Sequence, residues 1–345
     1  MIPALTAVLA LGFAIALLDQ WRERRHAFQL VWAVGMTFFG IGSAAEAVAS
    51  FAGWSEPLYR IWYLTGAAWT PAWLGLGTAF LLSKTRFGYT YAFLLVGAGL
   101  IALVIRNAPA YAGAGPLPIL YLIVALILAL AIGIETYFQN ARWTEFAAAA
   151  VIGTTLLSVG LMVATTLAAP GYAVDPATGQ PVATLMPGYL RLLTPVLNFT
   201  GALSLAFGAL FSAYTFMTKR RVLAYSLDPR QSGDQFLFNL LIAPVAIIVN
   251  LAASIPGAAR DLAIGRLNSR VPATLLIAIG AFVASAGDTL NRFGVTAPFA
   301  IAKLIAVVLL LAGFLVSIEV FREFRVPFTK IRLGVARRER GAGSH

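Results

Sequence analysis

Long apolar segments recur along the whole chain, and they restrict its fold more than any other feature. Most of them are long enough for a helix to cross the roughly 30 Å hydrocarbon core of a bilayer. Of the 345 residues, 60% are hydrophobic and 11% are charged, whereas soluble domains usually carry about 25% charged residues. The composition therefore predicts an all-α integral membrane protein.

The apolar pattern predicts about nine transmembrane helices. Alternate loops between them carry most of the 25 basic residues, and the positive-inside rule places such loops in the cytoplasm. The predicted topology has the N-terminus outside and the C-terminus in the cytoplasm. The predicted spans are 2–20, 27–51, 58–82, 90–106, 117–138, 145–169, 190–217, 272–290 and 297–320.

A further apolar segment, 235–256, is expected to enter the membrane only partly. A full crossing would place the basic residues that follow it outside, against the positive-inside rule. Pro244 lies near its middle and Pro256 near its end, and each removes a helix hydrogen bond. Broken backbone at membrane depth is tolerated only inside protein or beside water. We therefore predict a re-entrant helical hairpin or a cytoplasmic-side interfacial helix.

This topology divides the chain into four parts. Residues 1–218 are predicted to form a seven-helix membrane bundle, and 219–271 a cytoplasmic loop that carries the re-entrant or interfacial segment. Residues 272–320 form a two-helix hairpin, and 321–345 a basic cytoplasmic tail. Basic residues interspersed with apolar ones favour binding of that tail to anionic lipid.

Two segments suggest an internal repeat. The segment from Tyr59, YRIWYLTGAAWTPAWLGLGTAFLLSKTR, and the segment from Tyr189, YLRLLTPVLNFTGALSLAFGALFSAYTFMTKRR, share an aromatic and basic start, a middle rich in small residues and a basic end. Spans 1–3 and 5–7 could then be parallel three-helix repeats joined by span 4, a type of plan found in transporters such as the SWEET family. The arrangement is also similar to seven-helix receptors and rhodopsins.

No cofactor is expected. The chain has no cysteine and only two histidines, His26 and His345, which excludes a bis-histidine haem and thiolate metal sites. A lysine in a late helix would suit retinal, but Lys303 lies too near the start of its span. Histidine is the most common residue in general acid–base catalysis, and it is nearly absent from this chain. An enzyme, for instance one that modifies lipids, is therefore the least favoured class.

Candidate ligand-binding residues lie first on spans 2 and 3. Glu46 shares a helix face with aromatic and glycine residues, and it is expected either to reach water or Arg60 or to bind a coupling ion or proton. Trp69 and Trp73 continue a single predicted stripe on span 3. They are expected either to pack against a neighbouring helix or to form the wall of a ligand cavity. The other members of that stripe are Tyr59, Trp62, Gly66 and Gly77.

The remaining candidates lie on spans 7, 8 and 9. Asn198 belongs to a small polar stripe that serves either as interhelical glue or as part of a substrate path. Asp288 and Lys303 face each other across a short outer loop, so they are predicted to pair. The pair is expected either to be a structural ion pair or to take part in gating or proton transfer.

Two classes of function remain. The favoured one is a transporter of a small solute or ion with its site among spans 2, 3 and 7, and the alternative is a non-catalytic sensor or assembly subunit that acts through a partner protein. The net charge of +11 is attributed to membrane orientation, so the bilayer and not nucleic acid is the expected partner. The arginine-rich, alanine- and glycine-rich composition favours a bacterial cytoplasmic membrane.

Overall fold

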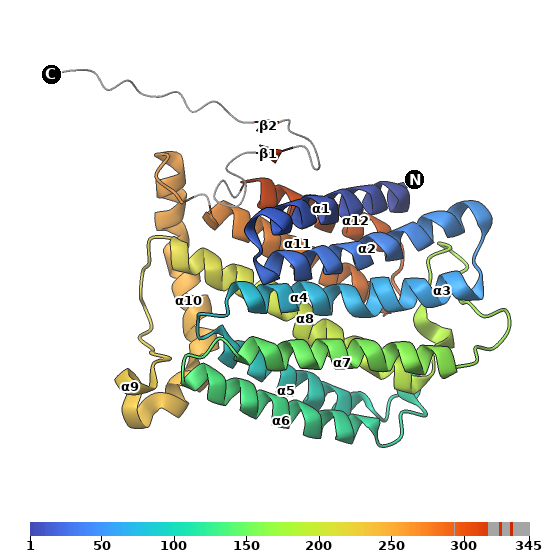
Figure 1. Ribbon diagram of the computed structural model, residues 1–345, viewed down its shortest axis with the longest axis horizontal. Coiled ribbons are helices and arrows are strands. Elements are labelled where there is room, and N and C mark those ends of the chain that lie inside the picture. Colours follow the sequence, from blue (N-terminus) through green and yellow to red (C-terminus); the bar gives the residue numbers. More distant parts are fainter. Residues whose placement is uncertain (269, 293, 317–323, 326–331, 334–345) are drawn as a thin grey trace.

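The computed structural model is a bundle of long helices that lie side by side, with one further long helix across an end of the bundle (Figure 1). It describes residues 1–268, 270–292 and 294–316, and the pairs 324–325 and 332–333. The main helices are α1 (Ile2–Arg24), α2 (Ala27–Ala52), α3 (Glu56–Trp62), η1 (Tyr63–Trp69), α4 (Thr70–Leu81), α5 (Phe87–Ile105), α6 (Leu117–Tyr137), α7 (Trp143–Ala164), α8 (Gly188–Phe216), α10 (Phe236–Ala263), α11 (Arg270–Arg292) and α12 (Phe299–Val316). The short elements are η2 (Pro109–Tyr111), η3 (Ala183–Leu185), α9 (Pro229–Ser232), η4 (Gly233–Gln235), β1 (Phe324–Arg325) and β2 (Arg332–Leu333).

Nine helices in the described ranges are long and apolar enough to cross a membrane. The prediction of an all-α, multi-pass membrane protein is therefore confirmed. The membership of the nine differs from the predicted spans in two places. The predicted span 58–82 is present but divided among α3, η1 and α4, whereas the segment Pro229–Ala263 is apolar enough to be counted. The predicted tail 321–345 lies almost entirely outside the described residues.

A π-helix interrupts the third predicted span. In η1 the backbone makes wider turns than an α-helix, and the hydroxyl of Thr70 donates a hydrogen bond to the carbonyl of Thr65 at 2.7 Å. Pro71 follows directly, and because proline lacks an N–H, the regular α-helical ladder cannot continue unbroken through this point. A π-helical segment is one of the local adjustments that accompany such breaks. It also changes the direction of the side chains that follow Trp62.

Glycines allow α4 to lie very close to its neighbours. A Cβ atom built on Gly75 would lie 2.3 Å from the carbonyl oxygen of Gly201 on α8. Just before α4, Gly66 in η1 meets Gly42 of α2 in the same way, because a Cβ built on Gly42 would lie 2.7 Å from the Cα of Gly66. Such contacts between small residues hold helices together in membranes. They place α4 between α2 and α8.

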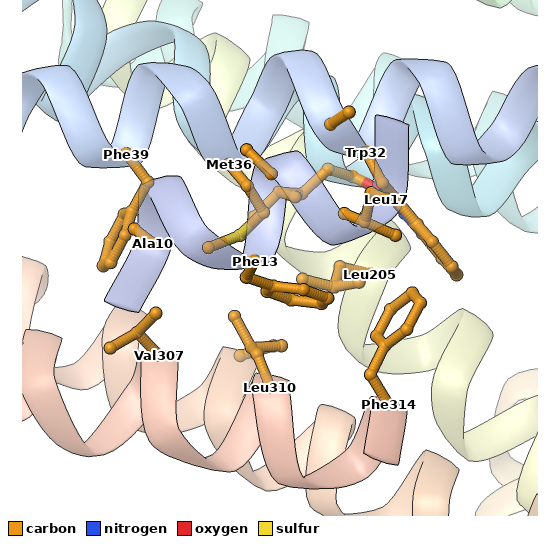
Figure 2. Close-up of a cluster of buried hydrophobic side chains, with 14 of the residues drawn as sticks. Ala10, Phe13, Leu17, Trp32, Met36, Phe39, Leu205, Val307, Leu310 and Phe314 are labelled. Atoms are coloured by element: carbon orange, nitrogen blue, oxygen red, sulfur yellow. The ribbon is translucent and has the colours of Figure 1, made fainter. Parts of the chain in front are cut away.

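The last helix, α12, packs against the first two, α1 and α2. Figure 2 shows Phe13 and Leu17 of α1 facing Leu310 and Phe314 of α12, with Trp32 of α2 beside them. The ring centroids of Phe13 and Phe314 are 4.6 Å apart, and those of Trp32 and Phe314 are 5.2 Å apart. This apolar core aligns α12 with α1 and α2, and it determines which face of α12 points towards α2.

The segment 235–256 does not form a hairpin. It lies within α10, which is one continuous helix of 28 residues with Pro244 and Pro256 inside it. The hairpin alternative is therefore wrong. Both proline rings lie on the exposed side of the helix, where the residues around them can adjust without disturbing the bundle. In Figure 1, α10 runs across one end of the bundle, at a large angle to the other long helices.

Candidate functional site

A buried ion pair joins α2 and α12. The Nζ atom of Lys303 lies 2.7 Å from Oε1 of Glu46. Glu46 is 4% exposed and Lys303 is 8% exposed, so both charges are removed from solvent. Charged side chains within membrane-spanning helices are costly, and they usually pair with one another and mark functional sites. This pair is the centre of the candidate site.

Aromatic side chains surround the pair. The indole Nε1 of Trp62 donates a second hydrogen bond to Oε1 of Glu46, at 2.8 Å. Lys303 Nζ lies 5.6 Å from the ring centroid of Phe39 and 5.2 Å from that of Phe299. Both distances are within the range of cation–π attraction. The carboxylate is therefore held by two donors, and the ammonium is held by one carboxylate and two rings.

A buried hydroxyl lies on the same face of α2. Phe39, Ser43 and Glu46 follow one another at helical spacings of four and three residues, so they share one face. Ser43 is 0% exposed, and its Oγ has no hydrogen-bond partner among the described residues. An unsatisfied buried hydroxyl is unfavourable, so Ser43 leaves one unpaired polar group on the helix face that also carries Glu46.

The pair that the sequence predicted between Asp288 and Lys303 is wrong. Lys303 contacts Glu46, and the carboxylate of Asp288 accepts a hydrogen bond at 3.2 Å from the Nδ2 of Asn198. The two helices are neighbours as predicted, because a Cβ built on Gly287 would lie 2.6 Å from the Cβ of Ala302. Lys303, one position further along α12, points around the helix towards α2.

Arg60 is likewise not the partner of Glu46. Its guanidinium binds Glu56 one turn earlier, at 2.6 and 2.9 Å. It also donates to the carbonyl of Thr165 at 2.5 Å and to that of Met162. These carbonyls lie at and just beyond the end of α7, where unpaired backbone oxygens attract a cation. Arg60 therefore fastens α3 to α7 and leaves Glu46 to Lys303 and Trp62.

Trp69 and Trp73 contact a different helix from Trp62. Their indole N–H groups donate to the hydroxyls of Ser158 and Thr155 on α7, at 2.8 and 3.2 Å. The single stripe predicted for the third span is therefore wrong, since the π-helix between Trp62 and these residues turns them towards α7. Their hydrogen bonds favour the packing interpretation, and they place both tryptophans outside the Glu46 site.

The long loop between α7 and α8 covers the neighbourhood of Trp62. Residues 174 and 181 form an isolated antiparallel bridge within it, and the hydroxyl of Tyr59 donates to the carbonyl of Val182. Tyr172, Ala173 and Ala183 from this loop pack against the cluster of buried side chains that includes Trp62 and Ala45. The loop therefore closes this end of the bundle over the layer that contains Glu46.

Asp175 stabilises that loop in a pH-dependent way. Hydrogen bonds from the hydroxyl of Thr296, the backbone N–H of Ala177 and the hydroxyl of Thr178 hold the pKa of Asp175 below its usual value. A lowered native-state pKa stabilises the protein above the unfolded-state pKa, and this contribution disappears as the pH falls through the native-state pKa. We expect Asp175→Asn to lower the melting temperature at neutral pH, and we expect the difference from the parent to shrink below about pH 4. Paired melting curves across that range measure it.

Several features of the site could be found from sequence and others could not. Glu46 and Lys303 were selected individually because charges are rare in apolar helices. Trp62 belongs to the predicted stripe on span 3, and Phe39 is one of the aromatic residues on the helix face of Glu46, but the sequence predicts no role for either in the site. Ser43 and Phe299 gave no signal, since serine and phenylalanine are ordinary in membrane helices. The sequence does not reveal how α12 is rotated about its own axis, because that rotation depends on packing between helices far apart in sequence.

Comparisons of the chain with protein-family models, with curated proteins and with solved structures found no match. In the part of the chain that the structure describes, no group of three or more acidic, histidine or cysteine side chains is arranged to hold a metal ion. The fold and the buried pair therefore define the protein as a polytopic membrane protein with a charged, aromatic-lined site between α2, α3 and α12.

Proposed function

We propose that the protein is a transporter of a small solute or ion, and that the Glu46–Lys303 pair is the element that its cargo opens. The observation that carries this proposal is the 2.7 Å ion pair with both side chains less than one-tenth exposed. Stability alone does not require such a pair, because apolar residues of similar volume are often as stabilising as a buried ion pair. The unsatisfied hydroxyl of Ser43 beside it supports a site that accepts a ligand.

The pair restricts the charge of the cargo. A solute that separates Glu46 from Lys303 leaves two buried charges, each of which must find an opposite charge. A small zwitterion satisfies both, and so does an anion on Lys303 together with a proton on Glu46. The cargo class is therefore zwitterionic, or anionic with proton coupling. Labelling of the Ser43→Cys thiol distinguishes the two classes. A zwitterionic cargo predicts that glycine slows the labelling, whereas an anionic cargo coupled to protons predicts that acetate slows it, and more so at mildly acid than at neutral pH.

The orientation proposed for the transporter follows its charges. The basic residues around Arg25, Lys84, Arg142 and Arg220 lie in connections at the end of the bundle that α10 crosses (Figure 1). We assign this end to the cytoplasm of a bacterial cell, with the N-terminus and the Glu46 site towards the outside. The parallel three-helix repeat remains a prediction within this proposal.

Cysteine accessibility tests transport without knowledge of the cargo. The chain contains no cysteine, so Ser43→Cys introduces a single thiol with little change in volume. A transporter that alternates between two open states should allow an impermeant maleimide to label this thiol from outside in intact cells, and also from the cytoplasmic side in inverted vesicles. Ser50→Cys serves as the control labelled only from outside, and Ser232→Cys as the control labelled only from inside.

Labelling of Ser43→Cys from one side only, under all conditions, would contradict the transporter proposal. That result would favour the alternative, a sensor or assembly subunit in which the pair is a fixed structural contact. If the two controls do not label from their expected sides, the orientation is wrong while the transport test itself remains interpretable.

A further inference from the structure

The outer face of α10 is apolar along its whole length. Between Phe236 and Ala259 the helix has no acidic, basic or histidine residue. Six large side chains at spacings of three, four and seven residues are each more than half exposed and form what we call the apolar stripe: Phe238, Leu241, Val245, Ile248, Ile255 and Leu262. A soluble surface rarely exposes a continuous apolar area of this kind, so the stripe has a partner other than water.

Two polar side chains of α10, those of Asn250 and Ser254, are bound on its opposite face. The Oδ1 of Asn250 accepts hydrogen bonds from the backbone N–H groups of Val222 and Leu223 at 2.7 and 2.9 Å, and its Nδ2 donates to the carbonyl of Leu223 at 2.8 Å. The Oγ of Ser254 accepts from the N–H of Arg220 at 2.9 Å. The segment that joins α8 to α9 therefore covers the side of α10 that carries Asn250 and Ser254, opposite the apolar stripe.

The contacts of α10 lie at one end of the bundle. At its start, Phe236 lies against Tyr89, near the first residue of α5, and against Tyr137, the last residue of α6. Near its other end, Ala258 packs with residues at the end of α8 and the beginning of α11, namely Tyr214, Met217 and Val271. A helix that crossed the membrane would meet opposite ends of its neighbours. Helix α10, about 42 Å long at 1.5 Å per residue, instead connects helix termini on the same side.

Charged residues of both signs border the uncharged stretch. Arg230 and Asp234 precede it, and Arg260, Asp261 and Arg266 follow it. An amphipathic helix with an apolar face and charged residues at its margins is suited to the boundary between headgroups and acyl chains. A soluble protein partner would also cover an apolar stripe, but it would not account for the position of the stripe beside the apolar side chains that the bundle itself exposes, such as those of α6.

We propose that α10 lies flat in the cytoplasmic leaflet, with the apolar stripe among the acyl chains and the charged residues that border it at the level of the headgroups. The occupant of the stripe is thus the bilayer itself. This inference is independent of the transporter proposal, because it concerns another surface and would hold equally for a sensor. It also accounts for Pro244 and Pro256, since proline on the lipid-facing side of an interfacial helix does not disturb a packed interface.

Spin labels measure the depth of α10 directly. Single cysteines at Leu241, Ile248 and Ile255 carry a nitroxide in the full-length protein, reconstituted in vesicles of phosphatidylethanolamine and phosphatidylglycerol. The collision rates with oxygen and with a water-soluble nickel chelate give the depth of each label. Ile127 on α6, which is 63% exposed, is the reference for the bilayer interior, and Ser232 is the reference for water.

The expected result is the same shallow depth at all three stripe positions, between the two references. A maximum of depth at Ile248, with shallower values at both flanking positions, would show a membrane crossing and overturn the proposal. High nickel accessibility along the stripe would place it in the cytoplasm and overturn it as well. Immobile labels that neither reagent reaches would indicate a protein partner or a second copy of the chain, which also excludes the bilayer as occupant.

Discussion

Lys303→Met should destabilise the detergent-solubilised protein strongly, because it leaves the carboxylate of Glu46 buried without its cation. Breaking a buried ion pair by removing one partner costs about 3–5 kcal/mol. Glu46→Gln should cost less, since the amide oxygen can still accept the hydrogen bond from Trp62. The double substitution should recover much of the loss, because it removes both charges together. Thermal unfolding of the four proteins under one detergent condition measures the coupling.

The salt bridge between Glu56 and Arg60 provides the matched control. Its carboxylate side chain is 41% exposed, and exposed ion pairs typically contribute about 0.2–1 kcal/mol. Glu56→Gln should therefore have a small effect in the same assay. Additive losses in the Glu46 and Lys303 variants would show that the two side chains do not stabilise each other, and the site as described would have to be abandoned.

The same double variant separates structure from function. If it folds stably but a cysteine at position 43 no longer labels from the cytoplasmic side, the pair is needed for the conformational change and not for the fold. If labelling from both sides persists, the pair serves stability alone, and the movement depends on other residues.

Hydrophobicity was sufficient to place most helices. The predicted span 117–138 differs by one residue at its end from α6 (Leu117–Tyr137), and the predicted span 90–106 starts three residues after α5 (Phe87–Ile105). Agreement of this kind follows from physics, because a helix that crosses a bilayer must be apolar over a length set by the hydrocarbon core. The length and polarity of a segment are both properties of its own residues.

Side-chain pairing was not predictable in the same way. Asp288 and Lys303 are on adjacent helices, as the short loop implied, but the partner of Lys303 is 257 residues away in sequence. Rotating a helix by one residue turns its side chains by about 100°, because the α-helix has 3.6 residues per turn. That rotation is set by the packing of Phe314 on Phe13 and Trp32, which no local pattern reveals. The π-helix before Pro71 had a similar effect on Trp69 and Trp73.

Gly201→Ala should destabilise the bundle strongly at a position away from the ion pair. A Cβ at this position would lie 2.3 Å from the carbonyl oxygen of Pro71 and 2.5 Å from the Cα of Ala72. These are backbone atoms, so no rotamer change can make room and α4 must move away from α8. Overpacking in a tight core typically costs about 1–3 kcal/mol, and a contact with backbone should reach the upper part of that range.

Gly153→Ala is the matched control for this prediction, because it makes the same chemical change in a helix where nothing lies within 4 Å of the new Cβ. Alanine is a better helix former than glycine by about 1 kcal/mol, so Gly153→Ala should leave the melting temperature unchanged or raise it slightly. A Gly201→Ala protein as stable as the parent would mean that α4 and α8 do not approach each other this closely.

The glycine contact should also be coupled to the ion pair. Since α2 packs on α4, and Glu46 reaches Lys303 from α2, a displaced α4 should weaken the ion pair. Combining Gly201→Ala with Lys303→Met should therefore cost less than the sum of the two separate losses.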